Sequence, residues 1–220
     1  MSTRICRLAL SVCLAVCASS SHAFEHRTQV SIGADADTQT VAVAWNPYWR
    51  CCGVEWVRIG TGLRFSAFRG QGITLETAEH DFINRDQTSV LTEVDPQILA
   101  FNGFISLDIV PSEWLVVGFN LDLLGGSFGP TQTGQYAENG FERTASLHPT
   151  ALNVLIGDTR DIGTLNSEFF LATPINEHWG IRAGFSHFFA EMQSSNALKH
   201  GGRRFRTIRN LGMLSATYRH

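Results

Sequence analysis

Seven charged residues are the side chains of this sequence best able to carry chemistry inside a fold. They are Arg58, Arg64, Asp108, Asp122, Glu168, Arg182 and Arg209. No phosphate loop, zinc-ligand spacing or Gly-x-Ser-x-Gly elbow accompanies them. Gathered in one interior, they could line a pore, bind a ligand or pair with one another. Pairing is the interpretation we favour, because a charge buried without a partner is costly.

His187 is a candidate general base, but its neighbours in the sequence offer no nucleophile. The two residues after it are phenylalanines, and the next serines are Ser194 and Ser195. A base must come within about 3 Å of the group whose proton it takes. The spacing therefore predicts no catalytic residue. The segment 157–161 lacks the full pattern of a calcium loop, so we expect neither a metal nor a cofactor.

The N-terminus has the pattern of a secretory signal peptide. Two arginines precede an apolar run over 8–18, and a short polar stretch ends at Ala23. The run is shorter than the roughly 20 apolar residues that a membrane-spanning helix needs. We expect cleavage after Ala23, so that 1–23 is the signal peptide and 24–220 forms one domain, since no linker divides it.

Cleavage would leave two of the five cysteines in the mature chain, Cys51 and Cys52. An adjacent pair closes no useful loop, so it adds little stability even if oxidised. We interpret the pair as a vicinal disulfide or as two thiols in a turn. A lipoprotein with its lipid on Cys17 is a less favoured alternative, because Val16 stands where a small residue is wanted.

Apolar and polar residues alternate with a period of two along much of the remaining chain, which is typical of strands. Five segments show the alternation clearly: 57–67, 99–109, 115–123, 165–175 and 179–189. Three shorter ones, 30–34, 41–45 and 214–218, bring the count to eight. In each clear segment one face is wholly uncharged, while the other mixes glycine with amide and charged residues.

The connections between these segments alternate between short and long. Pro111-Ser112-Glu113 and Asn176-Glu177-His178 are three residues long, whereas 71–97, 129–163 and 193–202 are extended. A three-residue turn keeps the apolar positions of both strands on one face, because side chains alternate with a period of two. The first turn predicts Leu107 opposite Val117, Ile105 opposite Phe119 and Asn102 opposite Asp122.

Alternation alone also suits a soluble barrel or sandwich with an apolar interior. The uncharged face, the asymmetry of the loops and aromatic residues at the segment ends favour a membrane barrel, with lipid outside and polar residues inside. These aromatic residues are Tyr48, Trp49, Trp56, Trp114, Trp179 and Tyr218. The sequence thus predicts an all-β fold: an eight-stranded antiparallel transmembrane up-and-down β-barrel whose lumen is filled by side chains.

On these features, the chain from residue 24 onward resembles the small eight-stranded Gram-negative outer-membrane β-barrels of the OmpA/OmpX type. The resemblance rests on architecture and on Leu214, Ala216 and Tyr218, which match the alternating C-terminal signal for the barrel insertion machinery. The last residue, His220, departs from the usual terminal aromatic. The resemblance implies a monomer in the bacterial outer membrane, in contact with membrane lipid and lipopolysaccharide, with a structural or surface-interaction role.

Loop charges add a second set of residues to this expectation. A basic rim facing lipopolysaccharide phosphates would consist of Lys199, Arg203, Arg204 and Arg206. Nucleic acid is not expected as a partner, because 17 basic against 20 acidic residues leave no dense basic face.

Two alternative functions stay open beside the structural role. One is an outer-membrane lipid hydrolase. The deacylase family places a serine two residues after its strand histidine, where this chain has Phe189. The other is a carrier of a small apolar ligand, lined by the inward residues Phe68, Phe104 and Phe170.

Overall fold

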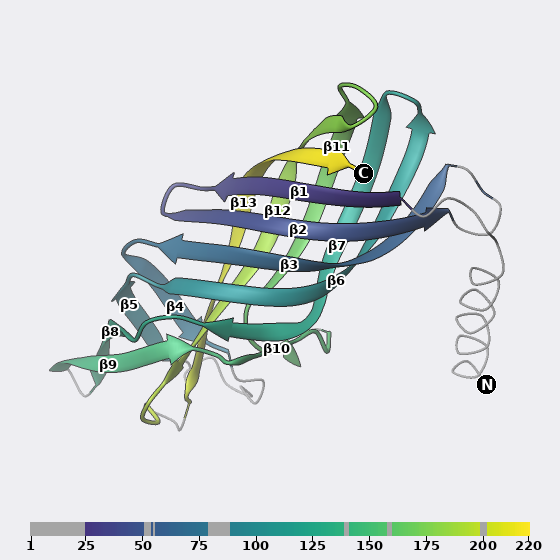
Figure 1. Ribbon diagram of the computed structural model, residues 1–220. Helices are drawn as coiled ribbons and strands as arrows, with labels where there is room; N and C mark the ends of the chain where they lie inside the picture. The colour runs from purple at the N-terminus through teal and green to yellow at the C-terminus, as the bar shows by residue number, and fades with distance from the viewer. Residues whose placement is uncertain are drawn as a thin grey trace, which may run out of the picture.

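Thirteen strands make up the fold of the computed structural model (Figure 1). They are β1 (Glu25–Ala34), β2 (Thr38–Arg50), β3 (Val57–Gly70), β4 (Ile73–Thr77), β5 (Val90–Val94), β6 (Gln97–Ser112), β7 (Leu115–Phe128), β8 (Gln132–Glu138), β9 (Phe141–Pro149), β10 (Leu152–Val154), β11 (Leu165–Pro174), β12 (Trp179–Ser194) and β13 (Arg204–Arg219). The structure describes residues 25–50, 54, 56–78, 89–138, 141–157, 160–198 and 202–220. The expected signal peptide, Cys51 and Cys52 lie outside these residues. Within them, no helix is both long and apolar enough to cross a membrane.

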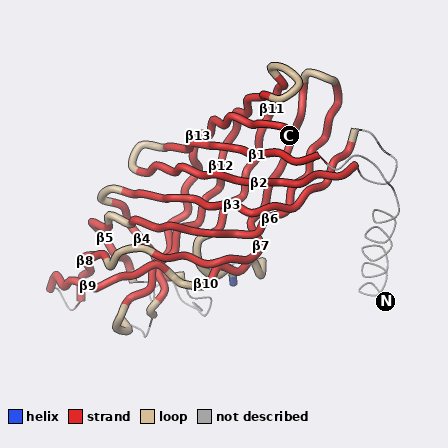
Figure 2. The backbone as a smooth tube through the Cα atoms, viewed as in Figure 1, coloured by secondary structure: helices blue, strands red, loops and turns tan. Residues whose placement is uncertain are grey.

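Eight long strands pair edge to edge in a closed circle, which we call the strand ring. Its order is β1, β2, β3, β6, β7, β11, β12 and β13, and β13 pairs with β1 again. Every pairing is antiparallel, so the predicted all-β class and antiparallel arrangement are confirmed. Figure 2 shows that strands account for most of the described backbone.

Five shorter strands, in addition to the eight of the strand ring, occupy stretches that were expected to be loops. Four of them, β4, β5, β8 and β9, pair in that order and connect β13 to β12. Since β12 also pairs with β13, these six strands close a second circle, the distal ring. Its four short strands have only five to nine residues, too few alternations to stand out in the sequence.

The strand ring carries apolar side chains outside and charged side chains inside. The outward Ile32, Phe169 and Leu214 are 57%, 50% and 60% exposed, whereas the inward Arg64 and Glu168 are each 1% exposed. This is the reverse of a protein that folds in water, where apolar side chains fill the interior.

The distal ring has the ordinary polarity. Its inward side chains form an apolar core in which Leu75, Leu91 and Leu147 are fully buried. Phe68 and Phe188 of the strand ring join this core and stack with centroids 4.9 Å apart. The interior of the molecule therefore changes from polar to apolar part of the way along the long strands.

The β6–β7 turn differs from the predicted register. Strand β6 continues to Ser112, the backbone is irregular after Ile109, and the turn consists of the residues at 113–114. Leu107 consequently lies opposite Phe119 rather than Val117, Ile105 lies opposite Leu121, and Asn102 lies opposite Gly125. The partners of Leu107 and Ile105 on β7 are thus two residues further along the chain than predicted. Because two is an even number, the apolar residues of both strands still lie on the same face of the sheet.

The β11–β12 turn agrees with the prediction. Ile175 N donates to Trp179 O at 2.8 Å across the three residues 176–178. The side chain of Asn176 closes the turn, since its Oδ1 accepts hydrogen bonds from the backbone N–H groups of His178 and Trp179 at 2.9 and 2.8 Å. An asparagine in this position stabilises a turn through such bonds to the backbone.

Asp35 closes the β1–β2 turn at the opposite end. Its Oδ1 accepts hydrogen bonds from the backbone N–H of Asp37 and from both the N–H and the hydroxyl of Thr38, at 3.0, 2.7 and 2.7 Å. Partial burial acts to raise the pKa of Asp35, but these hydrogen bonds outweigh it and hold the pKa below its ordinary value. The ionised carboxylate therefore stabilises the turn at neutral pH, and this contribution is lost as the pH falls through the folded value.

Glycines opposite inward aromatic rings make room for them. Phe170 pairs with Gly118 of β7 on one side and with Gly184 of β12 on the other. At Gly118 the Phe170 ring and the carboxylate of Asp108 occupy the space that a Cβ would need. A ring lying over a cross-strand glycine is a recurrent way to fill a tightly curved sheet.

We predict that Gly118→Ala destabilises the protein by about 1–3 kcal/mol, the usual cost of overpacking. The matched control is Gly103→Ala, because the nearest atom to a Cβ added there is Leu124 O at 3.6 Å, an ordinary contact. Urea unfolding of the detergent-refolded protein, followed by tryptophan fluorescence, compares the two. Equal stability of both variants would contradict this account of the packing.

Candidate functional site

Four of the seven predicted charged residues meet in the middle of the strand ring. Arg64 of β3 contacts Asp122 of β7 at 2.7 Å and Glu168 of β11 at 2.8 Å. Arg182 of β12 lies 4.0 Å from the same Glu168. All four side chains are 1% or 2% exposed, so this central cluster is sealed from solvent.

Each arginine of the central cluster also lies over an inward aromatic ring. The Arg182 guanidinium is 3.2 Å from the centroid of Phe170, and the Arg64 guanidinium is 4.8 Å from that of Phe104. Such contacts stabilise a cation that has lost its water. Two of the rings that could have lined an apolar ligand site are therefore packed under guanidinium groups, and the third, Phe68, belongs to the distal core.

Neutral side chains complete the hydrogen bonding of both carboxylates. Asn120 and Asn166 donate to Glu168 at 2.7 and 3.3 Å, and Asn102 donates to Asp122 at 2.8 Å. The backbone N–H of Asn166 reaches Asp122 at 3.1 Å. The sequence prediction omitted these asparagines because it considered charges alone, although their parity places them on the inward face.

The sequence pattern predicted only one member of a second buried ion pair, Asp108, and missed its partner, Arg27. Asp108 accepts a hydrogen bond from Arg27 of β1 at 3.1 Å, and Arg27 also donates to the Tyr48 hydroxyl at 3.0 Å. Arg27 has the same parity as the inward residues Gln29 and Ser31. Extending the predicted segment 30–34 towards the N-terminus would therefore have placed Arg27 on the inward face. With Arg27 included, the described residues place three cations and three anions in the enclosed lumen: Arg27, Arg64, Arg182, Asp108, Asp122 and Glu168.

The other two predicted lumen residues lie away from the central cluster, towards opposite ends of the strand ring. Arg58, at the start of β3, is 3.7 Å from Glu25. Arg209 lies 4.0 Å from Asp37 in the β1–β2 turn, where both side chains are partly exposed. Neither residue belongs to the central cluster, because each is paired with an acidic residue near one end of the ring.

The residues of the predicted basic rim have different surroundings. Lys199 lies outside the described residues, and Arg203 is exposed. Arg206 is 2.8 Å and Arg204 3.7 Å from the carboxylate of Glu191 on the neighbouring strand β12. Two of the four basic side chains are thus held by a carboxylate. Contact of the rim with lipopolysaccharide stays a prediction.

Glu191 has the parity of the outward residues of β12, yet it is fully buried. It is buried because the chain that precedes β11 covers it. Gly163 N donates to Glu191 Oε1 at 3.2 Å, and Thr150 N donates to Glu191 O at 3.1 Å. Arg206 also donates to the carbonyl of Asp161. The connection between β9 and β11 is therefore fastened over the outer face of β12 by a buried ion pair.

His187 and Ser194 are on opposite faces of β12. His187 has the outward parity of Phe185 and contacts Asn210 Oδ1 through Nδ1 at 2.7 Å, whereas Ser194 is buried. The arrangement does not bring this histidine to the serine that a hydrolase would need. Among the described residues, no group of three or more histidine, cysteine or acidic side chains could hold a metal ion.

We predict that Glu168→Gln destabilises the fold by about 3–5 kcal/mol, because it leaves two buried guanidinium groups short of a counter-charge. The control Asp37→Asn removes the acidic partner of Arg209, in an ion pair that is partly exposed, and should cost about 0–1 kcal/mol. Both values come from urea midpoints in detergent. A small effect of Glu168→Gln would show that the central cluster does not depend on its charges.

No family model and no curated protein matches this sequence. Solved structures do match. Neisserial surface protein A has a TM-score of 0.41 at 4% identity, covering 89% of this chain and 96% of that one. The Yersinia pestis outer membrane protein Ail in a phospholipid nanodisc has a TM-score of 0.42 at 12% identity, covering 90% and 100%. At these values the likeness carries no information on activity. The structures to which this chain is similar are small outer-membrane β-barrel proteins.

Proposed function

We propose that residues 24–220 form an eight-stranded transmembrane β-barrel in a bacterial outer membrane, with a structural or surface-interaction role and a closed lumen. The observation that carries the proposal is the outward apolar face of the strand ring. No outward position carries a charge over 59–67 of β3, 99–111 of β6, 115–123 of β7 or 179–189 of β12. An apolar surface of this extent is far larger than monomeric proteins expose to water.

The dimensions of this apolar band support a bilayer. The outward residues of β6 from Leu99 to Ile109 span ten steps, about 33 Å along the strand at about 3.3 Å per residue. At a tilt of about 40° this is about 25 Å along the membrane normal, the height of the apolar band in outer-membrane barrels. Trp56, Trp114 and Trp179 lie at the end with the short turns, where an aromatic girdle belongs.

The orientation follows from the loops. Outer-membrane barrels have short periplasmic turns and longer external connections. The short β6–β7 and β11–β12 turns would therefore face the periplasm, and the distal ring would stand outside the cell. The outward polar residues of the distal ring would then be the surface that meets solvent, lipopolysaccharide or partners.

Two barriers in series support a closed lumen. The balanced charges of the central cluster fill its middle, and the apolar core of the distal ring covers its external end. Small eight-stranded barrels are normally filled by side chains. A structural role is thus better supported than conduction or catalysis.

The membrane location predicts opposite environments for two adjacent residues. Phe119 packs against the outward Phe169 in a tilted ring contact with centroids 5.1 Å apart, whereas Asn120 is 1% exposed and hydrogen-bonded to Glu168. In a background with Cys51 and Cys52 replaced by serine, Phe119→Cys should react with a lipid-phase label and be quenched by lipid-borne quenchers. Asn120→Cys should respond to neither. Shielding of position 119 from lipid, with stable protein in detergent-free buffer, would show that the barrel is soluble.

We also predict no stable porin-like conductance in planar bilayers for the purified protein. The reason is that both the central cluster and the distal core would have to open. The control is a porin of known conductance inserted under the same conditions. Sustained large channels from this protein would contradict the closed lumen.

A further inference from the structure

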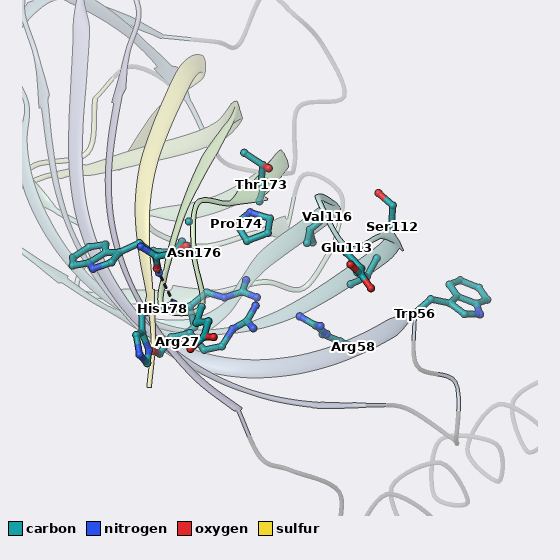
Figure 3. Close-up of a pocket in the computed structure, with 17 residues that line it drawn as sticks. Arg27, Trp56, Arg58, Ser112, Glu113, Val116, Thr173, Pro174, Asn176 and His178 are labelled. Carbon is teal, nitrogen blue, oxygen red and sulfur yellow. Dashed lines mark hydrogen bonds between the residues drawn. The ribbon is translucent and has the colours of Figure 1, made fainter.

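A cavity of ≈530 Å³ lies at the end of the strand ring that carries the β6–β7 and β11–β12 turns (Figure 3). Three arginines line it, Arg27 of β1, Arg58 of β3 and Arg219 of β13, and so do two glutamates, Glu113 and Glu177. The volume is in the range of small-molecule sites. We call this cavity the mouth.

The topology divides the charges of the mouth into two halves. Around the ring, β13, β1, β2 and β3 are consecutive, and they carry all three arginines. The remaining strands, β6, β7, β11 and β12, carry the two glutamates in their connecting turns. One wall of the mouth is therefore cationic and the other acidic. Figure 3 shows Arg27 and Arg58 pointing into the space that Glu113 borders.

Among the described residues, the cationic wall has few hydrogen-bond acceptors. Arg50, Arg58 and Arg219 share the carboxylate of Glu25 at 3.9, 3.7 and 3.8 Å, each too long for a direct hydrogen bond. Arg58 Nε is buried and has no hydrogen-bond partner among the described residues. Arg27 differs from these three, because Asp108 and Tyr48 already satisfy it.

A second buried polar atom in the mouth has no partner either. Ser112 Oγ, at the end of β6, lines the cavity and makes no hydrogen bond within the described part of the chain. Buried polar groups are normally satisfied by protein, water or a ligand. Two such groups at one cavity indicate that its contents include hydrogen-bonding groups.

We infer that the mouth binds a short peptide with a free carboxylate and a free ammonium group. The carboxylate would lie against Arg58 and Arg219, and the ammonium against Glu113 or Glu177. A dianion is disfavoured by the glutamates and a simple cation by the arginines. The site depends on the strand ring and not on the membrane location proposed above.

The test uses the full mature protein refolded in detergent micelles and alanyl-alanine as the probe, with binding measured by isothermal titration and ligand-observed NMR. Two matched ligands each lack one charge: N-acetyl-alanyl-alanine and alanyl-alanine amide. We expect the free dipeptide to bind at least tenfold more tightly than either blocked form.

Variants then assign each charge to its wall. Arg58→Gln should abolish the preference for the free carboxylate and keep that for the ammonium. The double variant Glu113→Gln, Glu177→Gln should do the opposite, because either glutamate can take the ammonium. Arg209→Gln, at the far end of the strands, should change nothing. Heat-dependent gel mobility verifies that each variant is folded.

Three results would overturn the inference. Equal binding of the acetylated and free dipeptides would make the mouth a plain anion site. Binding that Arg58→Gln leaves unchanged would place the ligand elsewhere. No binding of any form by folded protein would mean that water alone satisfies Arg58 and Ser112.

Discussion

The pairing of β1 with β13 is the contact on which the rest of the molecule depends. It joins residues from opposite ends of the chain, with Val30 opposite Ala216 and Ile32 opposite Leu214. Without it the strand ring would be an open sheet with two free edges, and a free edge exposes unpaired backbone groups. Closure satisfies these groups and separates an inside from an outside. The last residues reinforce it, because His220 N donates to His26 O and the His220 ring contacts the Thr28 hydroxyl at 2.9 Å.

Once the ring is closed, its polarity forces the charges inside to pair. Asp122, Glu168 and Arg182 come from the consecutive strands β7, β11 and β12, and Arg64 reaches them across the interior from β3. Because desolvating these charges is costly, the ion pairs stabilise the fold less than an apolar core would. An arrangement that left one of the charges without its partner would, however, be strongly destabilised. The central cluster is thus better understood as a determinant of one specific arrangement than as a source of stability.

The long strands β12 and β13 belong to two environments. One part of each strand lies in the strand ring, with Arg182 and Ser186 of β12 inside, and the other part lies in the distal ring, with Phe188 and Met192 of β12 inside. Because the two strands are antiparallel, the distal ring contains the end of β12 and the start of β13. The inward side chains thus change from polar to apolar within one strand. Such a change is expected where a strand passes from apolar surroundings into water. The same change places an apolar core across one end of the interior.

The period-two alternation was enough to predict the eight long strands, the inward charges and the uncharged outer face, because side-chain direction in a strand is a local property. The alternation could not predict the register at the β6–β7 turn. A shift of two residues keeps every side chain on the same face, so the alternation is the same for both registers. Nor could it predict the distal ring, whose short strands are stable only against a shared core. The partners of the charges were also beyond it: Arg27 with Asp108, Arg206 with Glu191, and Arg209 with Asp37. Parity states which face a side chain occupies, but distances across the interior depend on ring closure, strand tilt and register together, and these exist only in the folded chain.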